Sequence, residues 1–189
     1  YIVSSTLSIL LLLQPNKTKK HIGLYLLLVA QVQLMEYFMW LDQSCSNGLN
    51  HTASNTLHLL LLLQPMIICI GAIRYQTTTI SNEILWLFVL LSIIPITYSD
   101  YLSIKYNRKL CSKQYMQGHL NWDFQGKPEP TTIFHNNYLS IFYLVGIFSP
   151  WFFIKDTQLK YTILILLFGS LGISLLFNKT YKKYTLSKN

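Results

Sequence analysis

Long apolar runs alternate with short polar connections along this chain, and the runs approach the length of membrane-spanning helices. An α-helix rises 1.5 Å per residue, so about 20 apolar residues cross the ~30 Å hydrocarbon core of a bilayer. Charged or turn-forming residues bound each run. The sequence therefore predicts an all-α fold, a polytopic transmembrane helix bundle, with six visible spans at residues 1–14, 22–41, 56–73, 83–99, 137–154 and 159–177.

The first predicted span is shorter than the others. It opens at Tyr1 without a methionine, and residues 1–14 would make only about 21 Å of helix. We expect further residues before Tyr1 and seven spans in the intact protein. The segment lacks the basic region and the small-residue cleavage site of a secretory signal peptide.

Two polar segments stand outside the bundle, which we predict to be one transmembrane domain over residues 1–189. The loop 100–136 contains Gly118–Phe124, whose alternating polar and apolar residues predict a short strand or hairpin. That hairpin would either form a lid over the helix ends or lie in solvent with its aromatic residues among the lipid headgroups. The tail 178–189 is basic.

The charge content supports a membrane protein and not a nucleic-acid-binding one. Only 12% of the residues are charged, against about 25% in soluble domains. The net charge of +8 comes from basic residues in the connections and the tail, where they meet lipid headgroups. We therefore expect the bilayer as a partner and no nucleic acid. Which membrane holds the protein is left open.

The orientation in the membrane has two opposing readings. The side with the long loop and the tail carries nine basic residues and the other side six, which favours a cytoplasmic loop by the positive-inside rule. The dense cluster Lys17, Lys19 and Lys20 in a short connection favours the opposite orientation.

The three cysteines form no paired motif. Cys45 and Cys111 fall on the same predicted membrane face, so they could form a disulfide or remain free. Cys69 lies within a span and is expected to be a small apolar filler.

Glu36 is the most informative residue, because an ionisable group within a span costs roughly 2.5–3.5 kcal/mol on insertion scales and usually has a partner. Gln33, Glu36 and Trp40 share one helical face. His58 on the antiparallel third span is expected at a similar depth, where a Glu–His pair could share a proton. The simpler interpretation is a hydrogen bond that only joins the spans, worth about 0.6 kcal/mol.

Other polar residues are predicted at the same membrane face. Asp100 ends the fourth span, His119 lies in the long loop and His135 precedes the fifth span. The histidines show no metal-site spacing, and the chain has no nucleophile elbow or phosphate-binding loop. We therefore expect no cofactor and no metal. The predicted site comprises Glu36, Gln33, Trp40, His58, Asp100, His119 and His135.

The pattern Gln33-x-x-Glu36-x-x-x-Trp40 resembles a helix in an uncharacterised group of multi-pass membrane proteins from bacteria and large DNA viruses. In that group the helix follows the first span, and members begin with a Met-Cys-x-Ser segment, which would lie before Tyr1 here. The resemblance covers residues 22–45 and elsewhere only the hydropathy. It implies no activity, but it points again to Glu36 and Trp40.

The sequence favours a non-enzymatic role: binding or translocation of a small solute, proton or cation. Glu36 would be the charge carrier or ligand, Gln33 and His58 its hydrogen-bond partners, and Trp40 a wall of the site. One alternative is a structural subunit of a homo-oligomer or larger membrane complex that docks through loop 100–136. Another is a membrane-embedded lipid-modifying enzyme that uses Glu36 with His58 or His119.

Overall fold

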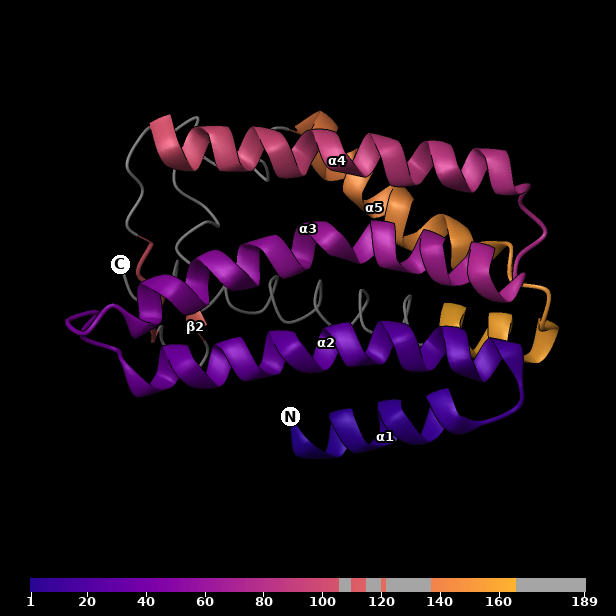
Figure 1. Cartoon of the computed structure of the whole chain (residues 1–189), viewed down its shortest axis with the longest axis horizontal. Helices are drawn as coiled ribbons and strands as arrows, with labels where there is room; N and C mark the ends of the chain where they lie inside the picture. Colours follow the sequence, from indigo (N-terminus) through magenta and orange to yellow (C-terminus); the bar gives the residue numbers. More distant parts are fainter. Residues whose placement is uncertain (106–109, 115–119, 122–136, 166–189) are drawn as a thin grey trace, which may run out of the picture.

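The computed structural model is an antiparallel helical bundle (Figure 1). It describes residues 1–105, 110–114, 120–121 and 137–165. Residues 157–165 also form helical turns. The helices are α1 (Ile2–Leu13), α2 (Lys17–Leu41), α3 (Leu49–Tyr75), α4 (Asn82–Lys105) and α5 (Asn137–Phe152), and the strands are β1 (Lys113–Gln114) and β2 (Leu120–Asn121). The predicted helical class is confirmed for these residues.

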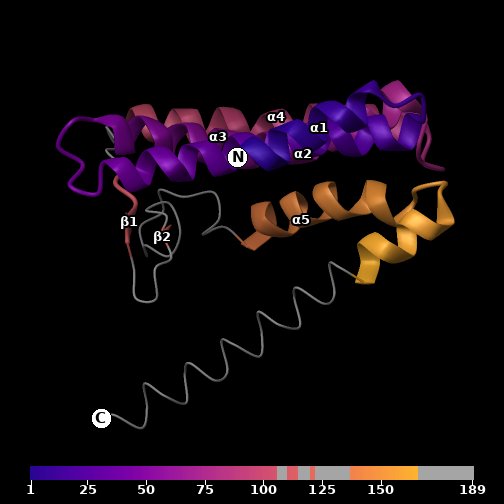
Figure 2. The same ribbon diagram turned by 90° about the horizontal axis from the view of Figure 1, so that it is seen from below.

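Helices α1 to α4 lie side by side in chain order, and α5 packs on one face of that layer (Figure 2). Helix α3 contacts α2, α4 and α5, so it is the central helix. In their most apolar windows, 56% of the α3 residues are buried but only 17% of the α2 residues. Helix α2 therefore presents much of its apolar surface outward.

Among the described residues, two helices, α2 and α3, are long and apolar enough to cross a membrane. Helix α1 has 12 residues and α5 has 16, and the apolar part of α4, Asn82–Tyr98, is also shorter. The sixth predicted span is described only as far as residue 165, and the tail lies outside the described residues.

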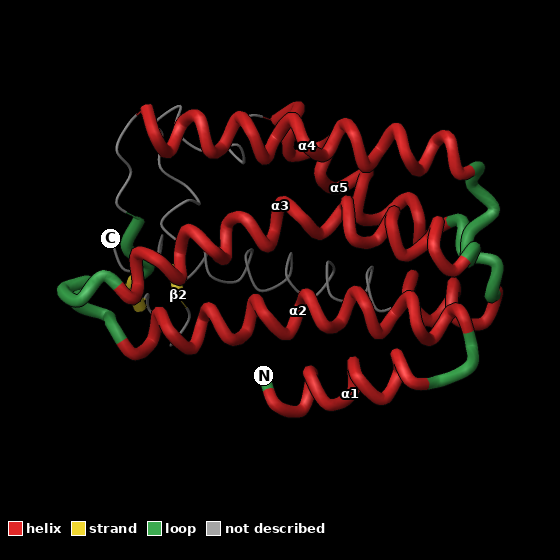
Figure 3. The backbone as a smooth tube through the Cα atoms, in the orientation of Figure 1, coloured by secondary structure: helices red, strands yellow, loops and turns green. Residues whose placement is uncertain are grey.

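Both long helices extend beyond the predicted spans into polar sequence. Figure 3 shows each of them as one continuous helix. Helix α2 begins at Lys17, where the Asn16 side chain accepts the backbone N–H of Lys19 as an N-cap. Helix α3 begins at Leu49, after Gly48 in the left-handed conformation. Apolarity marks the part of a helix that suits the bilayer core, whereas caps decide where the helix starts.

The interior consists of apolar clusters along α3. One lies between α2 and α3 and includes Met39 and Leu57, and another joins Ile68 to Ile147 and Trp151. Large apolar side chains also cover the outside, among them Val3 and Leu90, which are 80% and 59% exposed. An apolar exterior of this kind is expected against lipid and marks a membrane or interaction surface.

The predicted hairpin is present in part. Strands β1 and β2 pair antiparallel, with Lys113 opposite Asn121 and Gln114 opposite Leu120. Strand β2 falls within the segment 118–124 that predicted a strand. Whether this segment forms a lid is a prediction that falls outside the described residues.

Candidate functional site

The predicted face of α2 lies toward α1. The Ser4 hydroxyl of α1 donates a 2.9 Å hydrogen bond to Oε1 of Gln33. Glu36, on the same face, is half-buried, and Trp40 is 39% exposed. The structure thus places Gln33 beside α1 and Trp40 on the outer surface of α2.

Helix α3 meets a different face of α2. That face carries Val32, Met35 and Met39, which pack in the cluster with Leu57. At about 100° per residue, it is turned roughly 100° from the face of Gln33 and Glu36. His58 is buried on α3, 5% exposed. The expected approach of His58 to Glu36 stays a prediction.

The remaining predicted residues lie near the end of the bundle at which α2 and α4 both end, or outside the described parts (Figure 1). Asp100 belongs to the last turns of α4. His119 and His135 lie outside the described residues. Within the part of the chain that the structure describes, no group of three His, Cys, Asp or Glu side chains could hold a metal ion.

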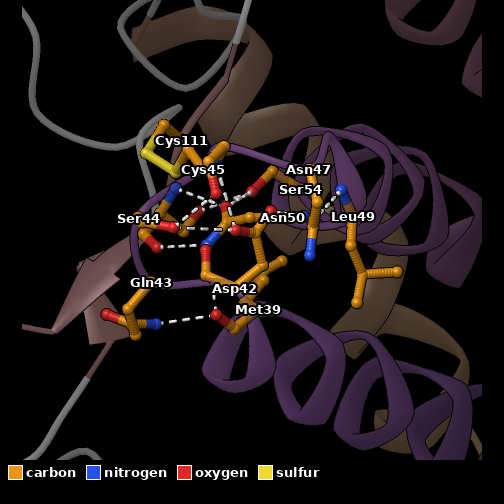
Figure 4. The surroundings of a disulfide bond; sticks show 12 residues. Met39, Asp42, Gln43, Ser44, Cys45, Asn47, Leu49, Asn50, Ser54 and Cys111 are labelled. Atoms are coloured by element: carbon orange, nitrogen blue, oxygen red, sulfur yellow. Dashed lines mark hydrogen bonds between the residues drawn. A yellow bond between two sulfur atoms is a disulfide. The ribbon is translucent and has the colours of Figure 1, made fainter.

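At one end of the bundle, a disulfide and a buried polar network hold a short segment against the turn between α2 and α3 (Figure 4). Cys45 and Cys111 are bonded, with Cα atoms 6.0 Å apart, so the disulfide alternative is confirmed. Asn50 is fully buried, and its Nδ2 donates to the carbonyls of Met39, Asp42 and Ser112 at 3.1, 3.0 and 2.7 Å. We call Asp42, Cys45, Asn50, Cys111 and Ser112 the clasp.

Asp42 is the charged member of the clasp. Its Oδ2 accepts the backbone N–H of Asn50 at 3.0 Å, and its Oδ1 accepts the Ser46 N–H and the Ser44 hydroxyl at 3.2 and 3.3 Å. These bonds, above all that from Asn50, hold the pKa of the carboxyl below its ordinary value, although burial partly opposes them. A carboxylate held in this way is a structural group, so the clasp joins chain segments.

Asn50 is not among the residues predicted from the sequence, because it lies in the polar connection between the second and third predicted spans. The usable signal was the density of Asp, Asn and Ser residues beside a cysteine, a composition typical of side chains that bond to backbone groups in turns.

At the opposite end, His21 joins three helices. The ring is fully buried, with Nε2 2.9 Å from the Ile68 carbonyl of α3 and Nδ1 2.8 Å from Oγ1 of Thr77. A carbonyl only accepts, so Nε2 carries the hydrogen in this arrangement. The ring stacks on Trp151 of α5 with centroids 4.9 Å apart. His21 lies in the polar connection before the second predicted span, so the apolar pattern does not single it out.

Backbone pairing fixes the position of Trp151. The N–H of Thr79 donates to the Phe153 carbonyl and the N–H of Lys155 to the Thr77 carbonyl, both at 2.8 Å. These bonds join the connection after α3 to the exit of α5. The end of α5 is therefore held against the connection after α3 by main-chain bonds and against α2 by the stacking of Trp151 on His21.

An apolar cavity of about 600 Å³ opens beside Trp151, between α2, α5 and the turns at 157–165. Trp151 forms one wall, with Tyr25 edge-on to it at a centroid distance of 5.7 Å. The Thr162 hydroxyl donates to the Gln158 carbonyl within its own helix. The lining residues are Ile22, Tyr25, Leu26, Leu144, Ile147, Phe148, Trp151, Leu159, Thr162 and Ile163. Walls of this kind suit a hydrophobic molecule.

The cavity and the predicted Glu36 site are separate features of α2. The lining residues of α2 lie between Ile22 and Leu26, and Glu36 follows ten residues after Leu26, about 15 Å along the helix.

The resemblance stated from residues 22–45 stays a prediction. Comparisons with protein-family models, with curated proteins and with solved structures find no match to this chain.

Proposed function

We propose that this protein is a multi-pass integral membrane protein. Two helices have the length and apolarity to cross a bilayer, and large apolar side chains face outward from the bundle. The shorter helices α1, α4 and α5 would accompany them, and the apolar sequence after residue 165 would extend the sixth span to Phe177. The charges of the described helices α1 to α3 lie mainly at their ends, where a membrane protein meets water.

The disulfide supports an orientation. Disulfides persist in oxidising compartments and are rare in the cytosol. The clasp end would therefore face the outside or a lumen. The opposite end, with Lys17, Lys19 and Lys20, would face the cytosol. Of the two opposing readings of the charge pattern, this selects the one based on the lysine cluster.

We propose that the protein binds a hydrophobic molecule from the membrane in the cavity beside Trp151. The observation that carries this function is the cavity itself, about 600 Å³ with nearly all of its lining apolar. Ligand pockets commonly have volumes of roughly 300–1,000 Å³ and apolar walls. The hydrogen bond of His21 to the Ile68 carbonyl and the backbone pairing after α5 hold the walls of the cavity in place.

A cavity-filling substitution tests this function. Ile163→Phe enlarges a lining side chain, whereas Leu90→Phe makes the same kind of change on the exposed surface of α4. Hydrophobic molecules that purify with the protein would be counted by native mass spectrometry. We expect the first variant to lose a bound molecule and the second to keep it. Equal retention in both variants would rule the cavity out as the binding site.

Passage or binding of a small solute, proton or cation at Glu36 is a second candidate function. It is favoured by the position of Glu36, half-buried within a helix that could span the membrane, beside Gln33 with its bond to α1. Flux into liposomes would be compared for the wild type, Glu36→Gln and, as a control, Glu83→Gln at the start of α4. A loss confined to Glu36→Gln supports this function, and equal flux in all three proteins ends it.

A further inference from the structure

The cavity lies close to the basic end of the bundle. Its lining begins at Ile22 on α2 and at Leu159 after α5, each within a few residues of lysines. The lining of α2 covers about 6 Å of helix, and that of α5, from Leu144 to Trp151, about 10 Å. In the proposed membrane position, the cavity therefore occupies one leaflet, directly below the headgroups of the basic side.

Two lysines continue the lining toward those headgroups. Lys19 precedes Ile22 by three residues and Leu26 by seven, so all three lie on one face of α2. Lys160 follows Leu159 and precedes Ile163 by three residues. Lys19 is exposed and Lys160 is partly exposed. A lysine stem can cover apolar surface while its ammonium group reaches the headgroup level.

Among the described residues, few acidic groups lie at the basic end beside the cavity. The basic end carries Lys17, Lys19, Lys20, Arg74, Lys155 and Lys160, against Glu83 and Asp156. Asp156 already accepts the backbone N–H of Leu159 through Oδ1 at 3.0 Å. The excess of positive charge at this end of the bundle complements a negatively charged headgroup.

We propose that the cavity binds an acidic phospholipid, with one acyl chain inside and its phosphate near Lys19 and Lys160. This inference rests on the proposed binding function and names the ligand class. Apolar walls select an acyl chain, and the lysines select the negative charge. Anionic lipids are enriched in the cytoplasmic leaflet, which the orientation places at this end.

The test uses a full-length variant in which Trp151 is the only tryptophan, with Trp40, Trp86 and Trp122 replaced by phenylalanine. The protein is placed in phosphatidylcholine vesicles that contain a small fraction of brominated phosphatidylglycerol or of brominated phosphatidylcholine. Bromine on the acyl chain quenches tryptophan fluorescence at short range, so quenching reports occupancy beside Trp151. The anionic preference is the ratio of the two quenching affinities.

We expect the phosphatidylglycerol preference to fall by roughly fivefold for each lysine removed. The variant Lys19→Gln/Lys160→Gln should therefore lose it, whereas Lys17→Gln/Arg74→Gln removes the same charge away from the lining and should keep it. Native mass spectrometry of phosphatidylglycerol retention by the protein with its natural tryptophans provides a second measurement.

The outcomes separate the two proposals. Equal quenching by both lipids, abolished by Ile163→Phe, would overturn the anionic assignment and leave the cavity as a hydrophobic site. The anionic assignment would also be overturned if both glutamine pairs lower the phosphatidylglycerol preference equally. The general positive charge of the surface would then explain that preference. Quenching that Ile163→Phe leaves unchanged for both lipids would overturn the binding function as well.

Discussion

Asn50 and Ser112 exchange two hydrogen bonds across 62 residues of sequence. The Asn50 side-chain amide donates to the Ser112 carbonyl at 2.7 Å, and the Ser112 backbone N–H donates to Oδ1 of Asn50 at 2.9 Å. The Asn50 side chain thus bonds to both the N–H and the carbonyl of Ser112, as a neighbouring strand would. This pair of bonds holds the segment 110–114 against α3. The adjacent disulfide closes the same connection covalently.

Replacing Asn50 by alanine should destabilise the protein strongly. The substitution leaves the buried backbone groups of Met39, Asp42 and Ser112 with fewer partners, at about 1–3 kcal/mol for each group left unsatisfied. The control is Asn55→Ala, because the Asn55 amide contacts the His51 ring on the same helix. Thermal unfolding in detergent would compare the two variants. Equal losses would show that Asn50 has no special role.

The two ends of the bundle should differ in their access to a membrane-impermeant maleimide. After mild reduction of intact cells that carry the protein in the plasma membrane, Cys45 and Cys111 should react from outside, because the proposed orientation places the clasp there. A cysteine introduced as Lys17→Cys should react only after the membrane is permeabilised. Mass shifts on a gel would report both reactions. Labelling of Lys17→Cys in intact cells would reverse the orientation.

Gly71 should tolerate a methyl group only when His21 is removed. A Cβ at Gly71 would overlap the His21 ring, with Nε2 only 2.9 Å away. Gly71→Ala should therefore cost about 1–3 kcal/mol by overpacking. In a His21→Ala background the same change should cost little, because the ring is gone. Unfolding of the four proteins completes this double-mutant cycle, and additive costs would contradict the contact.

Acid should weaken the clasp through Asp42. The bond from the Asn50 N–H, with those from Ser46 and Ser44, lowers the pKa of Asp42 from 3.8. A lowered folded-state pKa gives stability that is complete above the ordinary value and is lost as the pH falls through the folded-state value. Unfolding measured from pH 7 down to about pH 2 should show this loss in the wild type. Asp42→Asn should remove that part of the pH dependence, and an unchanged profile would contradict the assignment.

Much of the fold could be predicted from apolar patterning, but the buried polar contacts between distant segments could not. The end of α2 at Leu41 coincides with the end of the apolar run, because polar residues follow it. The start of α3 lies seven residues before its apolar run, since Asn50 and Ser54 face the clasp and not solvent. A sequence pattern shows polarity, but not that a polar residue is buried among partners from distant segments.

The candidate functional residues could also be recognised from the sequence only in part. Glu36 stood out because it interrupts an apolar run, and it remains a candidate. His21 drew no attention because it follows two lysines, although it is fully buried against Trp151. The cavity depends on how α5 and the turns after it pack on α2, a tertiary relationship that periodicity within one helix does not contain.

The most direct test of the account is whether a membrane lipid stays bound in the cavity. The protein and Ile163→Phe would be extracted in the same mild detergent and weighed by native mass spectrometry. We predict that the wild type retains a phospholipid, that Ile163→Phe lacks it and that Leu90→Phe, treated in the same way, keeps it. Identical lipid retention by the wild type and Ile163→Phe would contradict it.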